Sequence, residues 1–187
     1  MTMGRVLEIH SRQLLGDDAA VWSEQSVLLP AVEMSAGEFY QRYLAYLRRV
    51  TLGMVRPGQR GDEVRFLFLG LPLITFSVSL AGESEVILRI VGGFLVDPAR
   101  CHRGLLTFRA EPHAKGVRLT LSLADYCPLI LGSSRPSFIR KECYRLTQAA
   151  IHRLVTVRFL RSLCRELVGK SRCRLVTLRA RRGEEDI

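Results

Sequence analysis

Four histidines and five cysteines are the residues of this chain that could bind a metal or act as nucleophile and base. They are spread along all 187 residues: His10, His102, His113 and His152, with Cys101, Cys127, Cys143, Cys164 and Cys173. The cysteines form no CxxC pair and no histidine lies at zinc-finger spacing, so neither a zinc site nor a disulfide framework is indicated. None belongs to a nucleophile or metal-ligand motif. We therefore expect no metal and no cofactor, and the sequence favours a non-catalytic protein over an enzyme.

Paired carboxylates and glycine-rich turns give no further support for catalysis. Asp17-Asp18 and the Glu83 and Glu85 pair fall in segments that read as turns, where solvated carboxylates are expected rather than an acid-base pair. Gly92-Gly93 is followed by Phe94 and lacks the lysine and hydroxyl residue of a phosphate-binding loop.

The charge of the chain is basic and uneven. Lys and Arg number 28 against 18 Asp and Glu, and 14 of the basic residues lie between positions 135 and 182 with only Glu142 and Glu166 as acids. Guanidinium groups bind phosphate oxygens bidentately, so an anionic partner is one interpretation: nucleic acid, an anionic membrane surface or an acidic protein. A solvated helix face is the other. The candidate anion-binding residues are Arg158, Arg161, Arg165, Arg172 and Arg174.

Hydropathy and cysteine usage indicate the compartment. No apolar stretch approaches the roughly 20 residues that span a bilayer, so we expect no transmembrane helix. An odd number of cysteines without a leader sequence favours a reducing compartment, and we expect a cytoplasmic protein.

The first third of the chain predicts two strands and a helix. Residues 5–10 and 21–32 are candidate strands. Ser35 and Glu38 have the spacing of a capping box, which predicts that a helix begins there. Apolar residues then recur every three or four positions, and the helix is expected to end between Gly53 and Pro57.

The middle of the chain changes to a period of two. Alternating apolar residues predict strands near 64–69, 74–80, 86–90, 94–96, 106–108 and 117–123. The connections between them are short, which predicts an antiparallel sheet, because a parallel pair needs a longer crossover.

A long amphipathic pattern follows from residue 135 to 168, beginning near Pro136. At about 1.5 Å per residue such a helix would be roughly 50 Å long, so we expect a kink or an overhang. Residues 172–182 can add a strand, and residues 183–187 are expected to be loose. We therefore predict one α+β domain over 1–169 and a basic C-terminal extension over 170–187.

The order of these elements resembles that of the helix-grip, START-like (SRPBCC) superfamily, which includes plant pollen allergens, polyketide cyclases and lipid-transport domains. The resemblance covers roughly residues 20–168. It rests on topology, on Gly92-Gly93 within the sheet and on the last strand running through Asp125-Tyr126-Cys127-Pro128 towards the final helix. It implies an α+β fold in which a curved antiparallel sheet grips a long C-terminal helix.

The resemblance also implies a cavity between sheet and helix that holds an apolar small molecule or lipid. Its lining would be Phe66, Phe76, Phe94, Phe108 and Leu121, with Tyr126 and His152 as polar groups. The same residues also fit a filled core. The sequence thus favours non-catalytic binding or transport of an apolar ligand. The alternatives are an arginine-rich protein that binds nucleic acid or another anionic partner, and a subunit of a larger assembly.

Overall fold

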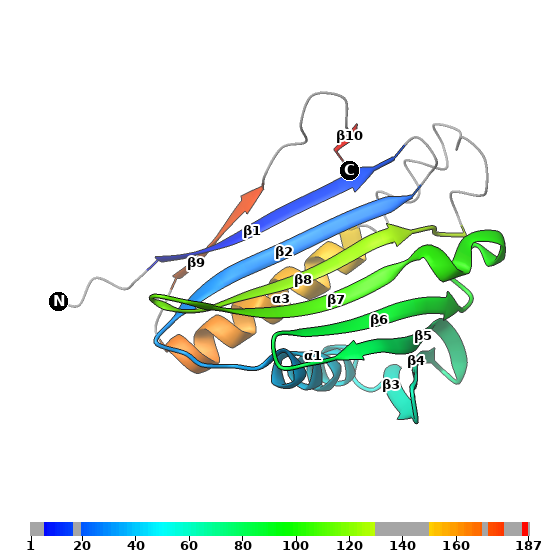
Figure 1. Cartoon of the computed structure of the whole chain (residues 1–187), viewed down its shortest axis with the longest axis horizontal. Coiled ribbons are helices and arrows are strands. Elements are labelled where there is room, and N and C mark those ends of the chain that lie inside the picture. The colour runs from blue at the N-terminus through cyan, green and yellow to red at the C-terminus, as the bar shows by residue number, and fades with distance from the viewer. Residues whose placement is uncertain (1–5, 17–19, 130–149, 170–171, 178–184, 187) are drawn as a thin grey trace.

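A large sheet with two long helices on one face makes up the fold (Figure 1). The computed structural model describes residues 6–16, 20–129, 150–169, 172–177 and 185–186. The elements in chain order are β1 (Val6–Leu15), β2 (Val21–Pro30), α1 (Ala36–Val50), β3 (Val55–Arg60), β4 (Glu63–Phe68), β5 (Leu71–Ala81), β6 (Glu85–Gly92), the 3-10 helix η1 (Pro98–Arg103), β7 (Leu105–His113), β8 (Gly116–Tyr126), α3 (Ala150–Val168), β9 (Arg172–Thr177) and β10 (Glu185–Asp186).

The strands form one sheet in the order β10-β1-β2-β8-β7-β6-β5-β4-β3, and β9 also pairs with β1. Neighbours from β3 to β8 are joined by antiparallel pairs, as the short connections predict. The β1–β9 pair is parallel, so the sheet is mixed. A parallel neighbour is possible there because α3 lies in the long connection between the two strands.

The helices cover one face of the sheet, called here the inner face. α3 packs against β1 and β2, and α1 packs against β6 and β7. Phe39 of α1, Phe108 of β7 and Phe159 of α3 meet at the centre, with ring centroids 5.6 Å apart in the Phe39–Phe108 and Phe39–Phe159 pairs. The predicted α+β class, with a curved sheet against a C-terminal helix, is confirmed.

α1 begins as its capping pattern predicts. The Ser35 hydroxyl accepts a hydrogen bond from the Glu38 amide at 3.2 Å, which satisfies one of the free donors of the first turn. The helix ends at Val50, after Arg48 and Arg49, whose charges suit the negative end of the helix dipole.

Several predicted elements need correction. Residues 55–60, expected to end the helix, form the edge strand β3, where Pro57 is tolerated because an edge strand needs fewer donors. Residues 94–96 form no strand: Gly93 has φ 122°, and Val96 makes only an isolated bridge with Pro128. A Cβ at Gly93 would lie 2.4 Å from the Leu73 carbonyl oxygen, so only glycine fits this bend.

The C-terminal part confirms one prediction and corrects another. The strand predicted from residue 172 is confirmed as β9, while residues 185–186, expected to be loose, pair with β1 as β10. α3 accounts for the last part of the predicted 135–168 helix, and residues 135–149 lie outside the described part of the chain. The domain boundary after residue 169 stays a prediction, although β9 and β10 both join the sheet.

Candidate ligand-binding site

Four polar side chains form a block on the inner face of β1 and β2, where an apolar core would be expected. Side chains of one strand face alternate sides, and burial alternates accordingly along both strands. Ser11 lies opposite Gln25, and Gln13 lies opposite Ser23. All four are buried, with exposed fractions between 0% and 6%. We call them the inner polar block.

Hydrogen bonds link the block but leave one acceptor without a partner. Gln25 Nε2 donates to Ser23 Oγ at 2.9 Å and lies 3.4 Å from Ser11 Oγ, while Gln13 Nε2 donates to Ser23 Oγ at 3.3 Å. Gln25 Oε1 is buried and has no hydrogen-bond partner among the described residues. A buried polar atom without a partner costs roughly 1–3 kcal/mol, so it calls for an explanation.

The contacts of α3 show which of its side chains face the sheet. Phe159 and Glu166, on one flank of the helix, contact α1. Arg153, on the other flank, donates to β9. At about 100° per residue, His152 and Thr156 lie between these flanks. They therefore face the sheet.

α3 packs against the two strands that carry the inner polar block, β1 and β2 (Figure 1). Arg153 Nη2 donates to Thr177 Oγ1 at 2.7 Å, and Thr177 pairs with Ser11 across the parallel β1–β9 ladder. His152 and Thr156 lie within one turn of Arg153 on this helix.

Both helix side chains carry buried polar atoms. His152 Nε2 has no hydrogen-bond partner within the described residues, while Thr156 Oγ1 interacts with the Tyr43 hydroxyl of α1. Burial lowers the pKa of His152 to about 4, so the imidazole is neutral at pH 7. Thr156 lies beside Tyr43 of α1; burial raises the pKa of the Tyr43 hydroxyl, and the Thr156 contact offsets part of that rise.

Four of the predicted lining residues lie on the inner face and are buried: Phe66, Phe76, Phe108 and Leu121. Phe66 and Phe76 contact each other, with ring centroids 5.1 Å apart. Phe108 contacts three aromatic rings of α1 and is therefore packed core. Leu121 pairs directly with Gln25, which places it beside the inner polar block.

Two other predicted residues lie elsewhere. Phe94 is 69% exposed, so the expectation that it faces inward is corrected: the bend at Gly93 turns it out of the sheet. Tyr126 is buried, but its hydroxyl donates to the Leu95 carbonyl at 2.8 Å, across the segment that follows β6. His152 lies on α3, the helix that packs against β1 and β2.

Sequence reasoning missed Ser11, Gln13, Ser23 and Gln25. Their signal is present in the period of two, since each polar residue occupies an inward position between buried apolar ones such as Ile9 and Val27. It was hidden because such residues are also typical of a solvated strand face. The pairing of Ser11 with Gln25 only appears once the register is known.

The five candidate anion-binding arginines lie on two sides of the molecule. Arg158 and Arg165 are exposed on α3, and Arg161 is partly buried beside them. Cys173 and Leu175 of β9 pack against the core, so the alternate residues Arg172 and Arg174 project from the opposite, outer face of the sheet. Three of the five arginines therefore lie together on α3, and the two of β9 lie apart from them on the outer face of the sheet.

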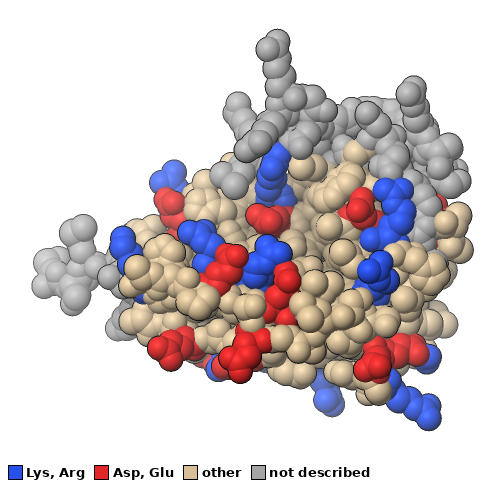
Figure 2. All heavy atoms as spheres, in the orientation of Figure 1, with Lys and Arg blue, Asp and Glu red and all other residues tan. Residues whose placement is uncertain are grey.

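The outer face of the sheet carries charges of both signs. Figure 2 shows basic and acidic side chains interspersed over it. Arg109 and Glu85, for example, form an ion pair of 2.6 Å between neighbouring strands. This face therefore presents no uniform basic surface to a polyanion.

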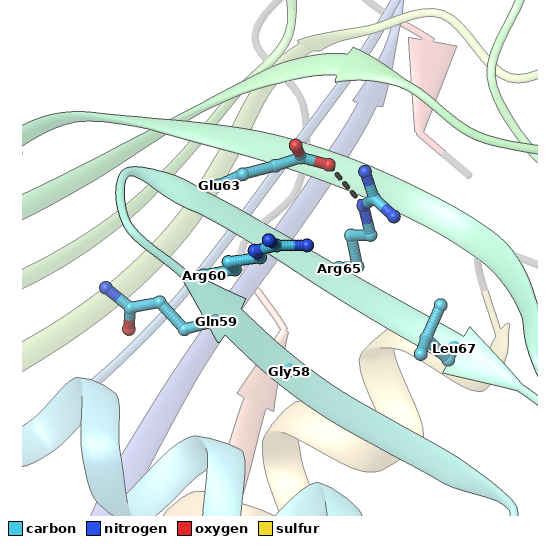
Figure 3. Close-up of a pocket in the computed structure, with 6 residues that line it drawn as sticks. All are labelled: Gly58, Gln59, Arg60, Glu63, Arg65 and Leu67. Carbon is cyan, nitrogen blue, oxygen red and sulfur yellow. Dashed lines mark hydrogen bonds and ion pairs between the residues drawn. The ribbon is translucent and has the colours of Figure 1, made fainter.

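A pocket of about 200 Å³ lies on the β3–β4 hairpin, lined by Gly58, Gln59, Arg60, Glu63, Arg65 and Leu67 (Figure 3). Gly58 leaves the floor open because it has no side chain. Arg65 is paired with Glu63, and the Gln59 side chain points away from that pair. The polar groups of this pocket are exposed and partly neutralised, so the inner polar block is the stronger candidate for a binding site.

The described residues contain no group of three or more His, Cys, Asp or Glu side chains that could hold a metal ion. Within the same part of the chain, no helix is both long and apolar enough to cross a membrane.

Comparison with known proteins gives only distant similarity to solved structures. No family model matches the sequence, and no curated protein matches it significantly. The Aha1 dimer from Colwellia psychrerythraea is 17% identical over 79% of this chain and 97% of that one, with a TM-score of 0.43. CalU16 from Micromonospora echinospora is 12% identical over 82% of each chain, with a TM-score of 0.41. EF2215 from Enterococcus faecalis, a conserved protein of unknown function, is 13% identical over 60% of each chain, with a TM-score of 0.34. Similarity this distant carries no argument about function.

Proposed function

We propose that this protein binds a neutral small molecule or lipid with a long apolar body and one polar end, without catalysis, between the sheet and α3. The observation that carries the proposal is a pair of buried polar atoms without a partner among the described residues, Gln25 Oε1 on β2 and His152 Nε2 on α3, the helix that packs against β2. Ligand sites are mostly apolar with a few convergent polar groups, which this arrangement matches.

The chemistry of the site favours a neutral polar end. His152 is uncharged at pH 7 because burial lowers its pKa to about 4, and the inner polar block consists of amides and hydroxyls. Asp97 is the one acidic or basic residue that is buried among the described residues, and its carboxylate caps η1. A buried carboxylate or phosphate would lack a counter-charge, which is costly. A hydroxyl can donate to Gln25 Oε1 and form a second hydrogen bond with His152.

The apolar body would lie along the inner face beside the block. Leu121 pairs with Gln25 and is fully buried, and Leu119 and Leu123 flank it on the same face of β8. The aromatic cluster of Phe39, Phe108 and Phe159 fills the interior beyond them. The ligand would therefore contact the leucine row of β8 and place its polar end between Gln25 and His152.

A series of ligands with one chain and different ends tests this proposal. Dodecanol, dodecanoate and dodecane are each titrated into the purified protein, and binding is followed by thermal unfolding and native mass spectrometry. We expect dodecanol to bind most tightly, because it alone supplies a neutral donor and acceptor. Equal binding of all three, or tighter binding of dodecanoate, would contradict the proposed site.

Two variants separate the site from a general effect on the core. Gln25→Leu removes the unpartnered acceptor and should weaken dodecanol about tenfold, in line with a lost hydrogen bond in a dry site, while dodecane is unaffected. Thr120→Val is the matched control: Thr120 is also buried, but it lies at an outward position of β8. It should leave the dodecanol affinity unchanged. Buried waters in place of a ligand would leave all three compounds unbound.

Binding of an anionic partner stays the alternative. Arg158, Arg161 and Arg165 recur at spacings of three and four on α3, and this is the observation in its favour. Its test is a salt titration of nucleic-acid binding with Arg158→Gln and Arg165→Gln, which should reduce the salt dependence if the helix contacts phosphates.

A further inference from the structure

Six exposed apolar side chains gather at one end of the sheet, far from the inner polar block. They come from three segments: the end of α1, the β4–β5 turn and the bend after β6. Their exposed fractions are 89% for Leu52, 49% for Met54, 36% for Phe68, 75% for Leu69, 64% for Leu71 and 69% for Phe94. We call these six residues the turn patch.

Backbone contacts join the three segments into one surface. The Leu69 amide donates to the Met54 carbonyl at 3.3 Å, which links the β4–β5 turn to the end of α1. Phe68 pairs with Leu71 across that turn. The Phe94 amide donates to the Pro72 carbonyl at 2.9 Å, next to Leu71. α1, β3 and β4 accordingly lie together at one end of the molecule (Figure 1).

Two residues of the turn patch have a backbone conformation that leucine disfavours. Leu52 has φ 51° and Leu69 has φ 50°, both in the left-handed region. Glycine or asparagine fits there, whereas a leucine costs on the order of 1 kcal/mol. Both side chains are largely in solvent, so packing within the described fold does not repay this cost. The two-residue β4–β5 turn requires a positive φ at Leu69 and Gly70, so the turn explains this conformation but not the choice of an exposed leucine.

Basic residues lie at the α1 side of the turn patch, and acidic ones are absent from its three segments. Arg48 and Arg56 are exposed in the segment that carries Leu52 and Met54, while Arg49 donates to Ser162 of α3. Residues 48–56, 68–73 and 93–95 contain no Asp or Glu. Glu63 lies at the far end of the β3–β4 hairpin, opposite Arg60. The surface therefore combines apolar turn tips with positive charge.

We propose that the turn patch docks this protein on a bilayer that contains anionic phospholipids. Apolar side chains on separate turn tips can enter the acyl region without a shape-matched partner, and the arginines then lie level with the head groups. Each arginine near an anionic surface contributes about 1 kcal/mol. This surface is distinct from the interior site, so it stands or falls independently of the ligand proposed above.

Vesicle co-sedimentation with the full chain tests this proposal. We expect binding to vesicles of phosphatidylcholine with phosphatidylglycerol, weaker binding to phosphatidylcholine alone, and a fall in binding at high salt. Leu52→Asn and Leu69→Asn remove the apolar tips while suiting the left-handed backbone, so the fold should be kept or stabilised. Each should weaken vesicle binding about tenfold, and Arg48→Gln about fivefold.

The matched control is Leu80→Asn. Leu80 is 47% exposed near the end of β5, at the opposite end from the β4–β5 turn. This variant should bind vesicles like the wild type, with circular dichroism confirming the fold of every variant. No binding of wild type to either vesicle would overturn the proposal. So would a wild-type dimer in size-exclusion chromatography that Leu52→Asn converts to a monomer, because a second copy would then be the partner.

Discussion

The inner face of the sheet has two halves that are packed in different ways. Over β7, three aromatic rings of α1 contact Phe108, and Phe159 of α3 stacks on one of them, Phe39. Over β1 and β2, α3 instead packs on the strands that carry the inner polar block. Gln25 of the block and His152 of α3 each have a buried atom without a partner among the described residues. One half is built for stability, and the other keeps polar groups that a stable core would not need.

The largest expected effect lies in the aromatic half. Phe108→Ala removes a fully buried ring that contacts Phe39, Tyr40 and Tyr43. The free energy of unfolding should fall by about 3–5 kcal/mol, since both transfer and cavity terms are lost. Urea unfolding at pH 7 measures this. A loss below about 1 kcal/mol would mean that this half is loosely packed and that the contrast between the halves is wrong.

In the polar half, the stability of the folded protein should depend on pH through His152. Its pKa in the folded protein, about 4, is lower than the ordinary value of 6.5, so the folded state binds fewer protons. The contribution of His152 to the free energy of unfolding is therefore fully present above pH 6.5 and is lost as the pH falls towards 4. The loss should be on the order of 3 kcal/mol at most.

His152→Leu isolates this contribution from the carboxylates that also titrate below pH 5. Urea unfolding of wild type and variant is compared at several values between pH 4 and pH 7, a range that brackets the two pKa values of the residue. We expect the wild type to lose more stability on acidification than the variant does. Parallel curves would show that the imidazole is solvated and is not part of a buried site.

The smallest expected change is in the stability of Gln25→Leu. The substitution removes an unpartnered buried acceptor, which favours the fold, and also the bond to Ser23 Oγ at 2.9 Å, which opposes it. The free energy of unfolding should change by less than about 1 kcal/mol, although the residue is fully buried. A loss of several kcal/mol would show that Gln25 is a structural residue, and the ligand site would lose its main support.

Local patterns predicted much of this fold. The capping box at Ser35, the period of two along β5 to β8 and the strand at Cys173 each depend on neighbours in sequence, and each is found in the structure. The edge strand β3 was missed because Pro57-Gly58 has the composition of a turn, and it is stabilised by pairing with β4 rather than by propensity.

The candidate site was harder to predict, since it depends on pairing across the sheet. His152 was named only as a polar group of the cavity that the family resemblance implies. Gln25 and Ser11 lie 14 residues apart, and they meet only because the β1–β2 register places them opposite each other. Phe94 was misplaced because the bend at Gly93 depends on the close approach of the Leu73 backbone, which no local pattern records.

The most direct test of the proposed site is a nuclear Overhauser measurement between isotope-labelled protein and unlabelled dodecanol. We expect the methylene protons beside the hydroxyl to contact Gln25 and His152, and the far end of the chain to contact the leucines of β8 around Leu121. Contacts confined to the exposed leucines at positions 52 and 69, or none with Gln25 and His152, would contradict the central claim that the polar half of the inner face is a ligand site.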